Sequence, residues 1–382
     1  MEDIIADELQ LKSNVRVLSE ARAKKAVRLS DQYLQTSLFS LLEGDHTNCT
    51  AIYDLAPRFI SRVDRPSDDA YLTAIMKDFT FNGEAYRVTV SPARIVYPDG
   101  TQRDELPGER EQLVEDVIRR MAADCMKVHQ DQIEIPFTIT GIQSELKKHG
   151  HTFSKSEIKE ALVILNKSTI EITKIAGEGQ RKAKPLLSAA AYPVLKFWDA
   201  SDPESKASVQ LNPLLVQAVK SLAFDQINYQ WMMRVKGSLA RWIFKYISLM
   251  QADPETPTVH TVELSAVEIA QSYGYIRSRW RSTLTEIENA FAKLNGKFSL
   301  GTVEKHEVFE GRKKVDIIFK VRLSDQFIAD RNFAKSRRSF IEDEMRSRVG
   351  ERPNTFHPIN QGEAEEINIS YRGIAKALPK AK

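Results

Sequence analysis

Cysteine and long apolar runs are both scarce in this chain. Its 382 residues include two cysteines, Cys49 and Cys125, too few for a disulfide framework or a zinc site built from clustered thiolates. No run of about 18 apolar residues occurs, so we expect no transmembrane helix and no membrane partner. The first residues, MEDIIADELQLKSN, are acidic and lack the apolar core of a signal peptide. We therefore expect a cytoplasmic protein.

Motifs of catalysis are missing as well. No G-x-x-x-x-G-K-[ST] loop is present, and Gly177-Glu178-Gly179 is too short for a nucleotide site. The pair His149 and His151 resembles the His-U-His metal motif of rolling-circle nickases, in which U is hydrophobic, but the residue between them is glycine. A histidine near a helix C-terminus is the plainer interpretation. We expect no enzymatic activity, no metal and no cofactor; a nicking replication protein is the less favoured alternative.

Positive charge is present but unevenly spread. The chain has 42% hydrophobic and 28% charged residues and a formal net charge of only +3. From Arg277 to Arg338 there are 15 Lys and Arg against 8 Asp and Glu, a net charge of +7. A local excess larger than that of the whole chain is the electrostatic footprint expected of a DNA-binding surface.

A pattern of helices followed by a hairpin occurs twice. In the first unit, the elements are a long helix at 108–128, a strand at 133–137, a short helix from 140 to 150, a helix from 154, and a hairpin over 169–192 with a basic tip at 177–184. Capping boxes open both later helices, at Thr140 and at Ser154. This order is that of a winged helix, in which the hairpin is called the wing.

The second unit repeats the order. Asn212-Pro213 and Ser238 are good helix starts, and Ser265 opens a short helix that stops at Gly274. A helix over 276–294 follows, then a hairpin with a basic tip at 311–314. Its return strand alternates apolar and polar residues, which predicts one buried face and one wet face.

The fold class that we predict is α+β, with two tandem winged-helix domains and extensions at both ends. The predicted parts are an N-terminal extension at 1–69, a first winged helix at 70–198, a second at 208–325, and a basic helix and tail at 326–382. Strands around an Asn82-Gly83 turn extend the first domain. The alternative is an α+β protein whose hairpins merely cover helices.

The 276–294 helix divides into two faces. At about 100° per residue, Ile276, Trp280, Leu284, Ile287, Phe291 and Leu294 lie along one line that faces the core. Trp280 is thus predicted to be a core anchor and not a base-stacking residue. The candidate DNA-binding residues are Arg277, Ser278, Arg279, Arg281, Ser282, Thr285 and Asn289 on this helix, Arg312, Lys313 and Lys314 in its wing, and Lys159, Arg181 and Lys182 in the first unit.

Such residue types suit the major groove, because arginine can bond guanine through two hydrogen bonds and asparagine can bond adenine. The alternative is a solvated polar helix face. The helix from Ser154 is less suited to reading DNA bases, since its outward face includes Glu160 and Val163. We therefore expect the second unit to read the sequence and the first to have an auxiliary DNA-binding or dimerisation role.

This arrangement resembles plasmid replication initiators of the iteron-binding class over roughly residues 70–325. The resemblance is carried by segments 85–90, 108–128, 136–146 and 212–247. It implies that the chain binds double-stranded DNA at origin direct repeats as a monomer, helps to melt an adjacent AT-rich region and recruits a host initiator and helicase. It also implies a monomer–dimer equilibrium in which dimers, formed through the first domain, repress their own promoter.

One further segment suggests a partner. Residues 35–39, with Gln35, Leu38 and Phe39, resemble the Q-L-S-L-F peptide by which bacterial proteins dock on the sliding clamp, although Thr36 replaces the usual leucine. Leu38 and Phe39 would fill an apolar pocket. Equally, this segment suits an amphipathic helix that packs on its own domain.

The charged helix expected at 326–349 contains Arg331, Lys335, Arg337 and Arg338, and we expect it to follow the DNA backbone or to be solvated. Two other function classes stay open. A winged-helix transcriptional regulator would bind an inverted repeat and would lack affinity for the clamp. A protein-interaction scaffold would show no salt-dependent DNA binding.

Overall fold

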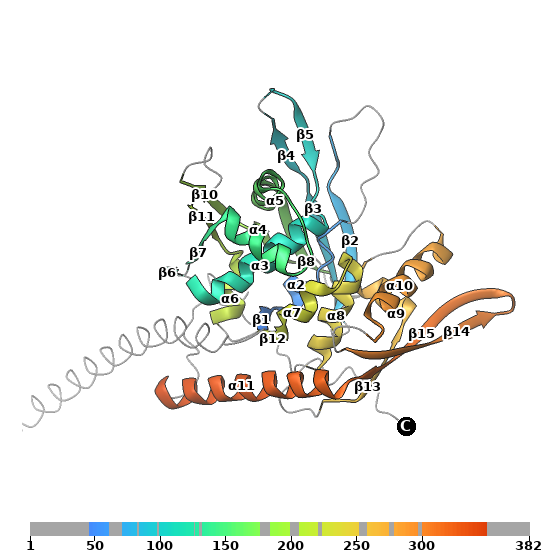
Figure 1. Ribbon diagram of the computed structural model, residues 1–382. Helices are drawn as coiled ribbons and strands as arrows, with labels where there is room; N and C mark the ends of the chain where they lie inside the picture. Colours follow the sequence, from blue (N-terminus) through green and yellow to red (C-terminus); the bar gives the residue numbers. More distant parts are fainter. Residues whose placement is uncertain are drawn as a thin grey trace, which may run out of the picture.

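The computed structural model describes most of the chain between His46 and Val349. The described residues are 46–60, 71–81, 84–97, 99–125, 127–129, 132–175, 184–198, 206–220, 224–251, 258–274, 279–296 and 300–349. Helices and several small antiparallel sheets alternate along it, so the class is mixed α and β (Figure 1). Buried apolar side chains form one main cluster that includes residues from Cys49 to Ile328. Side chains from both predicted units therefore pack into the same core.

Three helices form the centre of the first unit. The helix α3 (Glu109–Cys125) packs against α4 (Ile139–Lys148) and α5 (Lys155–Lys167). The predicted capping box at Ser154 is confirmed, because its side chain and that of Glu157 each bond the other's backbone amide. The box predicted at Thr140 is wrong by two residues: the cap of α4 is Thr138, whose Oγ1 accepts a hydrogen bond from the Gly141 amide at 3.0 Å.

The hairpin predicted after α5 is present and belongs to a four-stranded sheet. Its strands are β8 (Thr169–Lys174) and β9 (Lys184–Ala190), and β3 (Glu84–Ser91) pairs with β8 while β2 (Ile75–Phe81) pairs with β3. The strands around residues 82–83 thus extend this hairpin, as the sequence predicts.

The strand between α3 and α4 joins a different sheet. This strand, β7 (Gln132–Thr138), pairs with β6 (Lys127–His129) and with β11 (Lys206–Gln210), which in turn pairs with β10 (Val194–Phe197). In the first unit, therefore, the strand before the helix pair and the hairpin after it lie in separate sheets.

The second unit is more regular. Its helices are α6 (Pro213–Lys220), α7 (Tyr229–Arg234), α8 (Ser238–Met250), α9 (Ala266–Ser272) and α10 (Trp280–Leu294). Its sheet has the order β13-β15-β14, formed by β13 (Thr261–Ser265), β14 (Gly301–Glu310) and β15 (Lys313–Leu323). Gly301 begins β14 with a φ of +124°, and a Cβ there would lie 1.9 Å from the carbonyl oxygen of Arg322. Only glycine can start the hairpin at this close approach.

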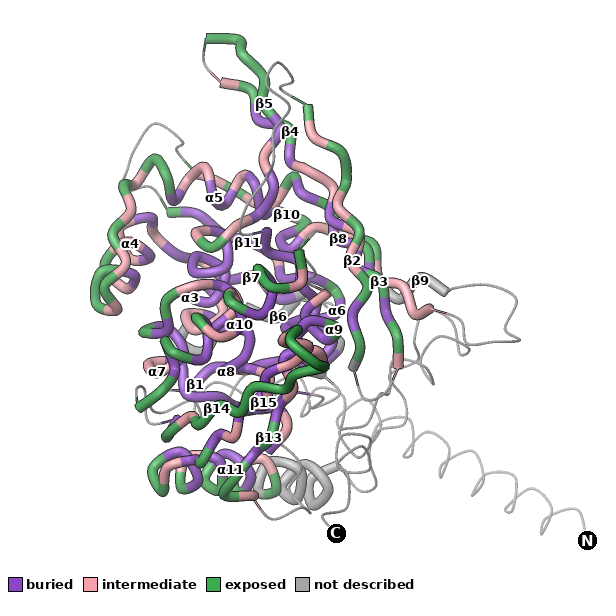
Figure 2. The backbone as a smooth tube through the Cα atoms, turned by 90° about the vertical axis from the view of Figure 1, so that its right-hand side faces the viewer, coloured by how far each residue is buried: buried purple, intermediate pink, exposed green. Residues whose placement is uncertain are grey.

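The described part of segment 1–69 packs inside the molecule. The strand β1 (His46–Cys49) pairs with β12 (Asp225–Asn228), and the short helix α2 (Ala51–Leu55), buried at every residue, contacts α8. Residues that were expected to belong to an N-terminal extension thus contribute to the core that both units share. Figure 2 shows this contrast, with buried backbone at the centre and exposed backbone at the outer end of the hairpin formed by β4 (Ala93–Val96) and β5 (Gln102–Glu105).

The charged C-terminal helix is present as α11 (Asp325–Val349) and packs against β12. The expectation that Arg331 follows DNA or is solvated is wrong. Its side chain is 1% exposed, and its Nη1 lies 3.0 Å from Asp225 Oδ2. Lys335 is also buried. A buried guanidinium paired with a carboxylate is unavailable to phosphates, and removing either partner would leave an uncompensated buried charge.

Candidate nucleic-acid interface

The outward face of α10 gathers most of the predicted reading residues. Leu284, Ile287, Phe291 and Leu294 are buried, as the helical phase predicts. The exposed side chains at its start and along its opposite face are Arg279, Arg281, Ser282, Thr285 and Asn289. Thr285 donates its hydroxyl hydrogen to the Arg281 carbonyl oxygen at 3.0 Å, which leaves its oxygen lone pairs as acceptors. Arg277 and Ser278 lie outside the described residues.

The start of this helix differs from the sequence prediction. We expected it to begin at about residue 276, but it begins at Trp280, and Arg279 is an N-cap in extended conformation (φ −115°, ψ 114°). The periodicity suggested the earlier start because Ile276 falls in phase with Trp280, and phase alone does not fix where a helix begins. Arg279 therefore projects from the helix entrance instead of from within its first turn.

Trp280 faces inward, as predicted, and also has a contact that the sequence did not suggest. It is partly buried against the core, and its indole Nε1 donates a hydrogen bond to the Val315 carbonyl oxygen at 2.8 Å. Val315 is the extra residue of a β-bulge, because Val308 pairs with Asp316 and Phe309 pairs with Lys314. The indole thus ties the first residue of α10 to the bulge of the hairpin.

The β14–β15 hairpin, called the wing below, runs alongside α10. Near the helix C-terminus the Val303 amide donates to Asn295 Oδ1 at 2.9 Å, and midway Lys305 pairs with Glu288. The Trp280–Val315 bond lies at the helix N-terminus. The wing tip therefore projects past the end of α10 that carries the exposed arginines, and Figure 1 shows the wing extending away from the body.

Asp316 fixes the other side of the bulge. Its Oδ2 accepts a hydrogen bond from Ser265 Oγ at 2.7 Å, and its Oδ1 accepts one from the Val267 amide at 3.1 Å. Ser265 is the predicted and confirmed cap of α9. The wing is thus attached through Asp316 to the start of α9 and through Val315 to the start of α10.

Ion pairs neutralise most of the wing's cations along its length. Lys314 lies 2.8 Å from Glu307 and lowers the pKa of that carboxyl, Arg322 lies 3.2 Å from Glu304, and Lys320 lies 3.3 Å from Glu263. Lys314, a predicted DNA contact, is therefore already paired. Within α10, its N-cap and the wing, the exposed lysines and arginines without an ion pair are Arg279 and Arg281 at the helix start, Lys293 at the helix end, and Arg312 and Lys313 at the wing tip. Four of these five cations thus lie at the start of α10 and at the wing tip.

The equivalent face of α5 is covered by the β4–β5 hairpin. Ile164 packs with Ala93 and Ile95, and Val163 packs against the same cluster. Tyr97, just after β4, donates its hydroxyl hydrogen to Glu160 at 3.0 Å.

The β4–β5 cover explains why Val163 and Glu160 lie on the outward side of α5. Val163 and Glu160 contact this chain's own β4–β5 hairpin and the residue after β4, so this face of α5 is not open to a DNA groove. Of the first unit's predicted DNA contacts, Lys159 is half-buried, while Arg181 and Lys182 lie outside the described residues.

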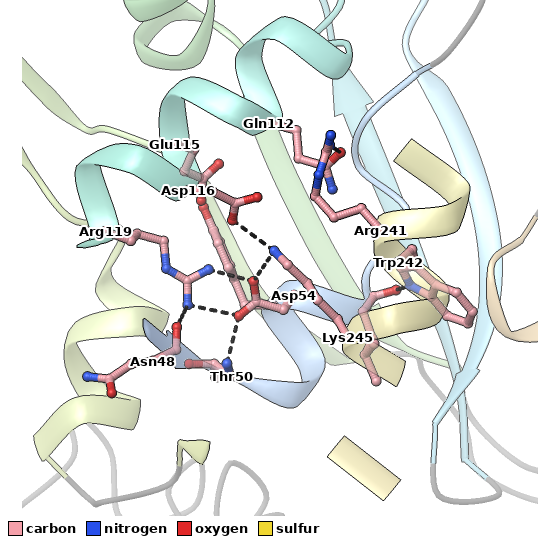
Figure 3. Close-up of polar contacts among 12 residues, drawn as sticks. Asn48, Thr50, Asp54, Gln112, Glu115, Asp116, Arg119, Arg241, Trp242 and Lys245 are labelled. Carbon is pink, nitrogen blue, oxygen red and sulfur yellow. Dashed lines mark hydrogen bonds and ion pairs between the residues drawn. The ribbon is translucent and has the colours of Figure 1, made fainter. Parts of the chain in front are cut away.

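A cluster of buried charges that the sequence analysis missed joins α2, α3 and α8 (Figure 3). Lys245 Nζ lies 2.8 Å from Asp116 Oδ1 and 3.2 Å from Asp54 Oδ1, and Arg119 Nη2 lies 2.9 Å from Asp54 Oδ2. Burial alone would raise the pKa of the Asp54 carboxyl, but Arg119 and Lys245 hold it well below its usual range. Arg241, one turn before Lys245, donates to Gln112 Oε1 at 2.7 Å.

A sequence signal for this cluster exists. Arg241 and Lys245 lie four residues apart within the otherwise apolar helix SLARWIFKYISLM, and charges on the inward side of such a helix indicate buried partners.

The two histidines of the nickase-like motif have structural partners. His149 is the C-cap of α4, where its Nε2 lies 3.3 Å from Glu145 and its ring meets Tyr229 edge-on. His151 Nε2 lies 2.7 Å from the Met233 carbonyl oxygen. Within the described ranges, no group of three or more His, Cys, Asp or Glu side chains is arranged to hold a metal ion. Nor does any described helix combine the length and apolar character needed to cross a membrane.

The clamp-like segment with Gln35, Leu38 and Phe39 lies outside the described residues.

Comparison with known proteins gives structural neighbours only. No protein-family model matches the chain, and no curated protein sequence matches it. A crystal structure of selenomethionine derivatives of domains 2 and 3 of RctB is similar with a TM-score of 0.43 and 12% identity, over 71% of this chain and 96% of that one. A second structure of RctB domains 2–3 gives a TM-score of 0.42 and 12% identity, over 74% of this chain and 99% of that one.

Proposed function

We propose that this chain is a sequence-specific double-stranded DNA-binding protein and that its second unit reads the DNA. The observation that carries the proposal is the exposed face of α10, where unpaired Arg279 and Arg281 lie beside Ser282, Thr285 and Asn289. Arginine and asparagine are the side chains best suited to guanine and adenine edges in the major groove. A reading helix inserts its N-terminal half most deeply; Arg281 lies in that half, and Arg279 is the N-cap directly before it.

The surrounding fold supports this assignment. The order α8, β13, α9, α10, β14, β15, with β13 paired to the return strand β15, is that of a winged helix. The first unit has the same order of helices and hairpin, although β7 pairs with β11 and the face of α5 is covered. We propose that it is a modified winged helix with an auxiliary or dimerisation role.

The cellular role that we propose is initiation of plasmid replication by binding direct repeats at an origin. It rests on the family resemblance of residues 70–325 together with the reading face described above. On this proposal the chain binds and positions DNA without catalysing a reaction. A winged-helix regulator that binds an inverted repeat is the alternative outcome of the test.

The test is unbiased selection of bound duplexes from a random pool, followed by footprinting on the selected DNA. Direct repeats would support an initiator, and a single palindrome would support the regulator. Absence of salt-dependent duplex binding would overturn the DNA-binding proposal altogether, because phosphate neutralisation makes such binding depend on salt.

Two substitutions are expected to differ in kind. Arg281→Ala should weaken binding to the selected site by about 1–3 kcal/mol and relax the preference at one base pair.

Lys313→Ala should weaken binding to all sequences about equally and should reduce the slope of log K against log salt by about 1. Both are measured by fluorescence anisotropy over a salt series on the selected and a scrambled duplex.

Lys320→Ala is the matched control, since Lys320 lies on the same strand but is paired with Glu263. A salt slope lowered as much by Lys320→Ala as by Lys313→Ala would count against a local contact at the wing tip. Wild-type binding by both Arg281→Ala and Lys313→Ala would contradict the assignment of α10.

For the N-terminal segment we propose docking on the sliding clamp through Gln35, Leu38 and Phe39, which rests on the sequence of residues 35–39. A peptide that covers residues 33–41 should compete with a known clamp ligand, and failure to compete would remove this proposal.

A further inference from the structure

The outer part of the wing carries exposed apolar side chains. Val308 and Phe309 are 39% and 55% exposed, although they lie on a strand whose other outward residues are mostly polar. Exposed phenylalanine on a hairpin far from the core gains nothing from folding. Single exposed apolar residues are ordinary on protein surfaces, so the position of Phe309 and the charges beside it decide whether it contacts another molecule.

The register of the hairpin shows where Phe309 points. Lys305 and Glu307 pair with Phe319 and Ile317, whose side chains are buried on the side of the sheet toward the core. Because the extra residue of the bulge lies on β15, the alternation along β14 continues without interruption. Phe309 thus shares a face with Lys305, the residue that bonds Glu288 of α10. It projects on the α10 side of the wing, beyond the helix N-terminus.

Charge around this ring favours a polyanion as the occupant. On the tip side of Phe309 lie the exposed, unpaired Arg312 and Lys313, opposed only by Glu310. On the other side lies the start of α10 with Arg279 and Arg281. An apolar ring between two sets of unpaired cations fits a ligand with phosphates at both edges and stacked apolar surfaces between them, which is double-stranded DNA.

The dimensions of the wing add a physical requirement. Its tip is a two-residue turn, since Glu310 pairs with Lys313, and paired strands lie about 4.8 Å apart before side chains are added. The minor groove of B-DNA is about 6 Å wide, so a two-stranded ribbon with side chains enters only if the groove opens. Apolar wedges that part a base step open the minor groove and kink the duplex by about 20–90°.

We propose that Phe309 is such a wedge: it inserts into a base step from the minor groove, next to the major-groove segment read by α10, and kinks the DNA. The inference rests on the proposed function and assigns to the wing the deformation of DNA in addition to phosphate contact. The bulge beside Phe309 is anchored to the start of α10 by the Trp280–Val315 bond and to the start of α9 by the Asp316 contacts. These anchors would hold the Phe309 ring in place while it parts the base step. A flexible pyrimidine–purine step is the expected position, because it unstacks most readily.

The experiment uses the full chain and a duplex chosen by the wild-type protein from a random pool, with 2-aminopurine placed at successive positions. Wild-type protein should raise the 2-aminopurine fluorescence at one step several-fold and should bring fluorophores at the two DNA ends closer together. Phe309→Ala should lose both signals and bind roughly tenfold more weakly, because the wedge contributes at a deformed step. Phe309→Leu should keep a reduced kink, since leucine is also an apolar wedge.

Trp198→Ala is the control, because Trp198 is an exposed aromatic residue (62%) on the first unit. It should behave like the wild type. Since Phe309 is exposed, its variants should keep the wild-type melting temperature, which separates loss of the wedge from loss of the fold. If Phe309→Ala bends and unstacks the DNA like the wild type, the wedge is wrong while the proposed function stands. If the wild-type protein binds no duplex, both are wrong.

Discussion

Lys245→Met is expected to lower the free energy of unfolding by about 3–5 kcal/mol, because it leaves a buried carboxylate without its cation. The Lys245 side chain is 3% exposed and bonds both Asp54 and Asp116. Asp54 would keep Arg119, but Oδ1 of Asp116 would lose Lys245, and its Oδ2 has no partner in the described structure. Methionine fills a similar volume, so the loss reports charge and not a cavity.

Urea unfolding of the purified chain measures this effect. Lys148→Met is the matched control: Lys148 also pairs with a carboxylate, Glu145 at 2.8 Å, but its side chain is 69% exposed. Exposed pairs contribute about 0–1 kcal/mol, so the control should stay within that range. Adding Asp116→Leu to Lys245→Met should recover part of the lost stability, because the uncompensated carboxylate is then gone. A loss below 1 kcal/mol for Lys245→Met, equal to that of the control, would contradict the role given to this cluster.

The buried charge cluster also shows why the sequence predicts the elements within each unit better than it predicts the contacts between the two units. The capping box at Ser154 and the buried stripe of α10 could be predicted because they depend on residues within a few positions of one another. The contact of Lys245 with Asp116 joins residues 129 positions apart, and nothing in a local period encodes it.

The same limit applies to the first unit. The pairing of β7 with β11 and the cover of β4–β5 over α5 depend on segments outside the repeated pattern. The pattern of helices and a hairpin was therefore sufficient to predict the elements but not the sheet to which β7 belongs. Arg331 also depends on a distant segment. It lies on a helix rich in polar residues, yet it is buried because Asp225 of β12 lies opposite it.

The candidate site was more predictable than the fold around it. The exposed residues of α10 follow from helical phase alone, since a side chain that is out of phase with Leu284, Ile287 and Phe291 must face away from the core. The sequence could not show which cations remain unpaired. Lys313 and Lys314 are neighbours of the same type, yet only Lys314 has Glu307 across the hairpin.

Trp280→Ala is expected to cost about 2–4 kcal/mol of stability, less than a fully buried tryptophan because the ring is only partly buried. Trp280→Phe should cost about 1 kcal/mol, since it keeps an aromatic ring against the core but removes the indole N–H that bonds Val315. The Phe variant thus separates the anchor of the helix from the attachment of the wing.

Measurements of DNA binding should distinguish the two roles of Trp280, which are to anchor the helix in the core and to attach the wing. Trp280→Phe should fold normally and keep base preference on α10, yet it should bind the selected site more weakly, because the wing is no longer fixed to the helix start. Urea unfolding and anisotropy on the same samples measure both quantities, with Trp198→Phe as an exposed-tryptophan control. If Trp280→Ala folds with unchanged stability and yet loses DNA binding, Trp280 contacts DNA directly, and the inward assignment of this side chain is wrong.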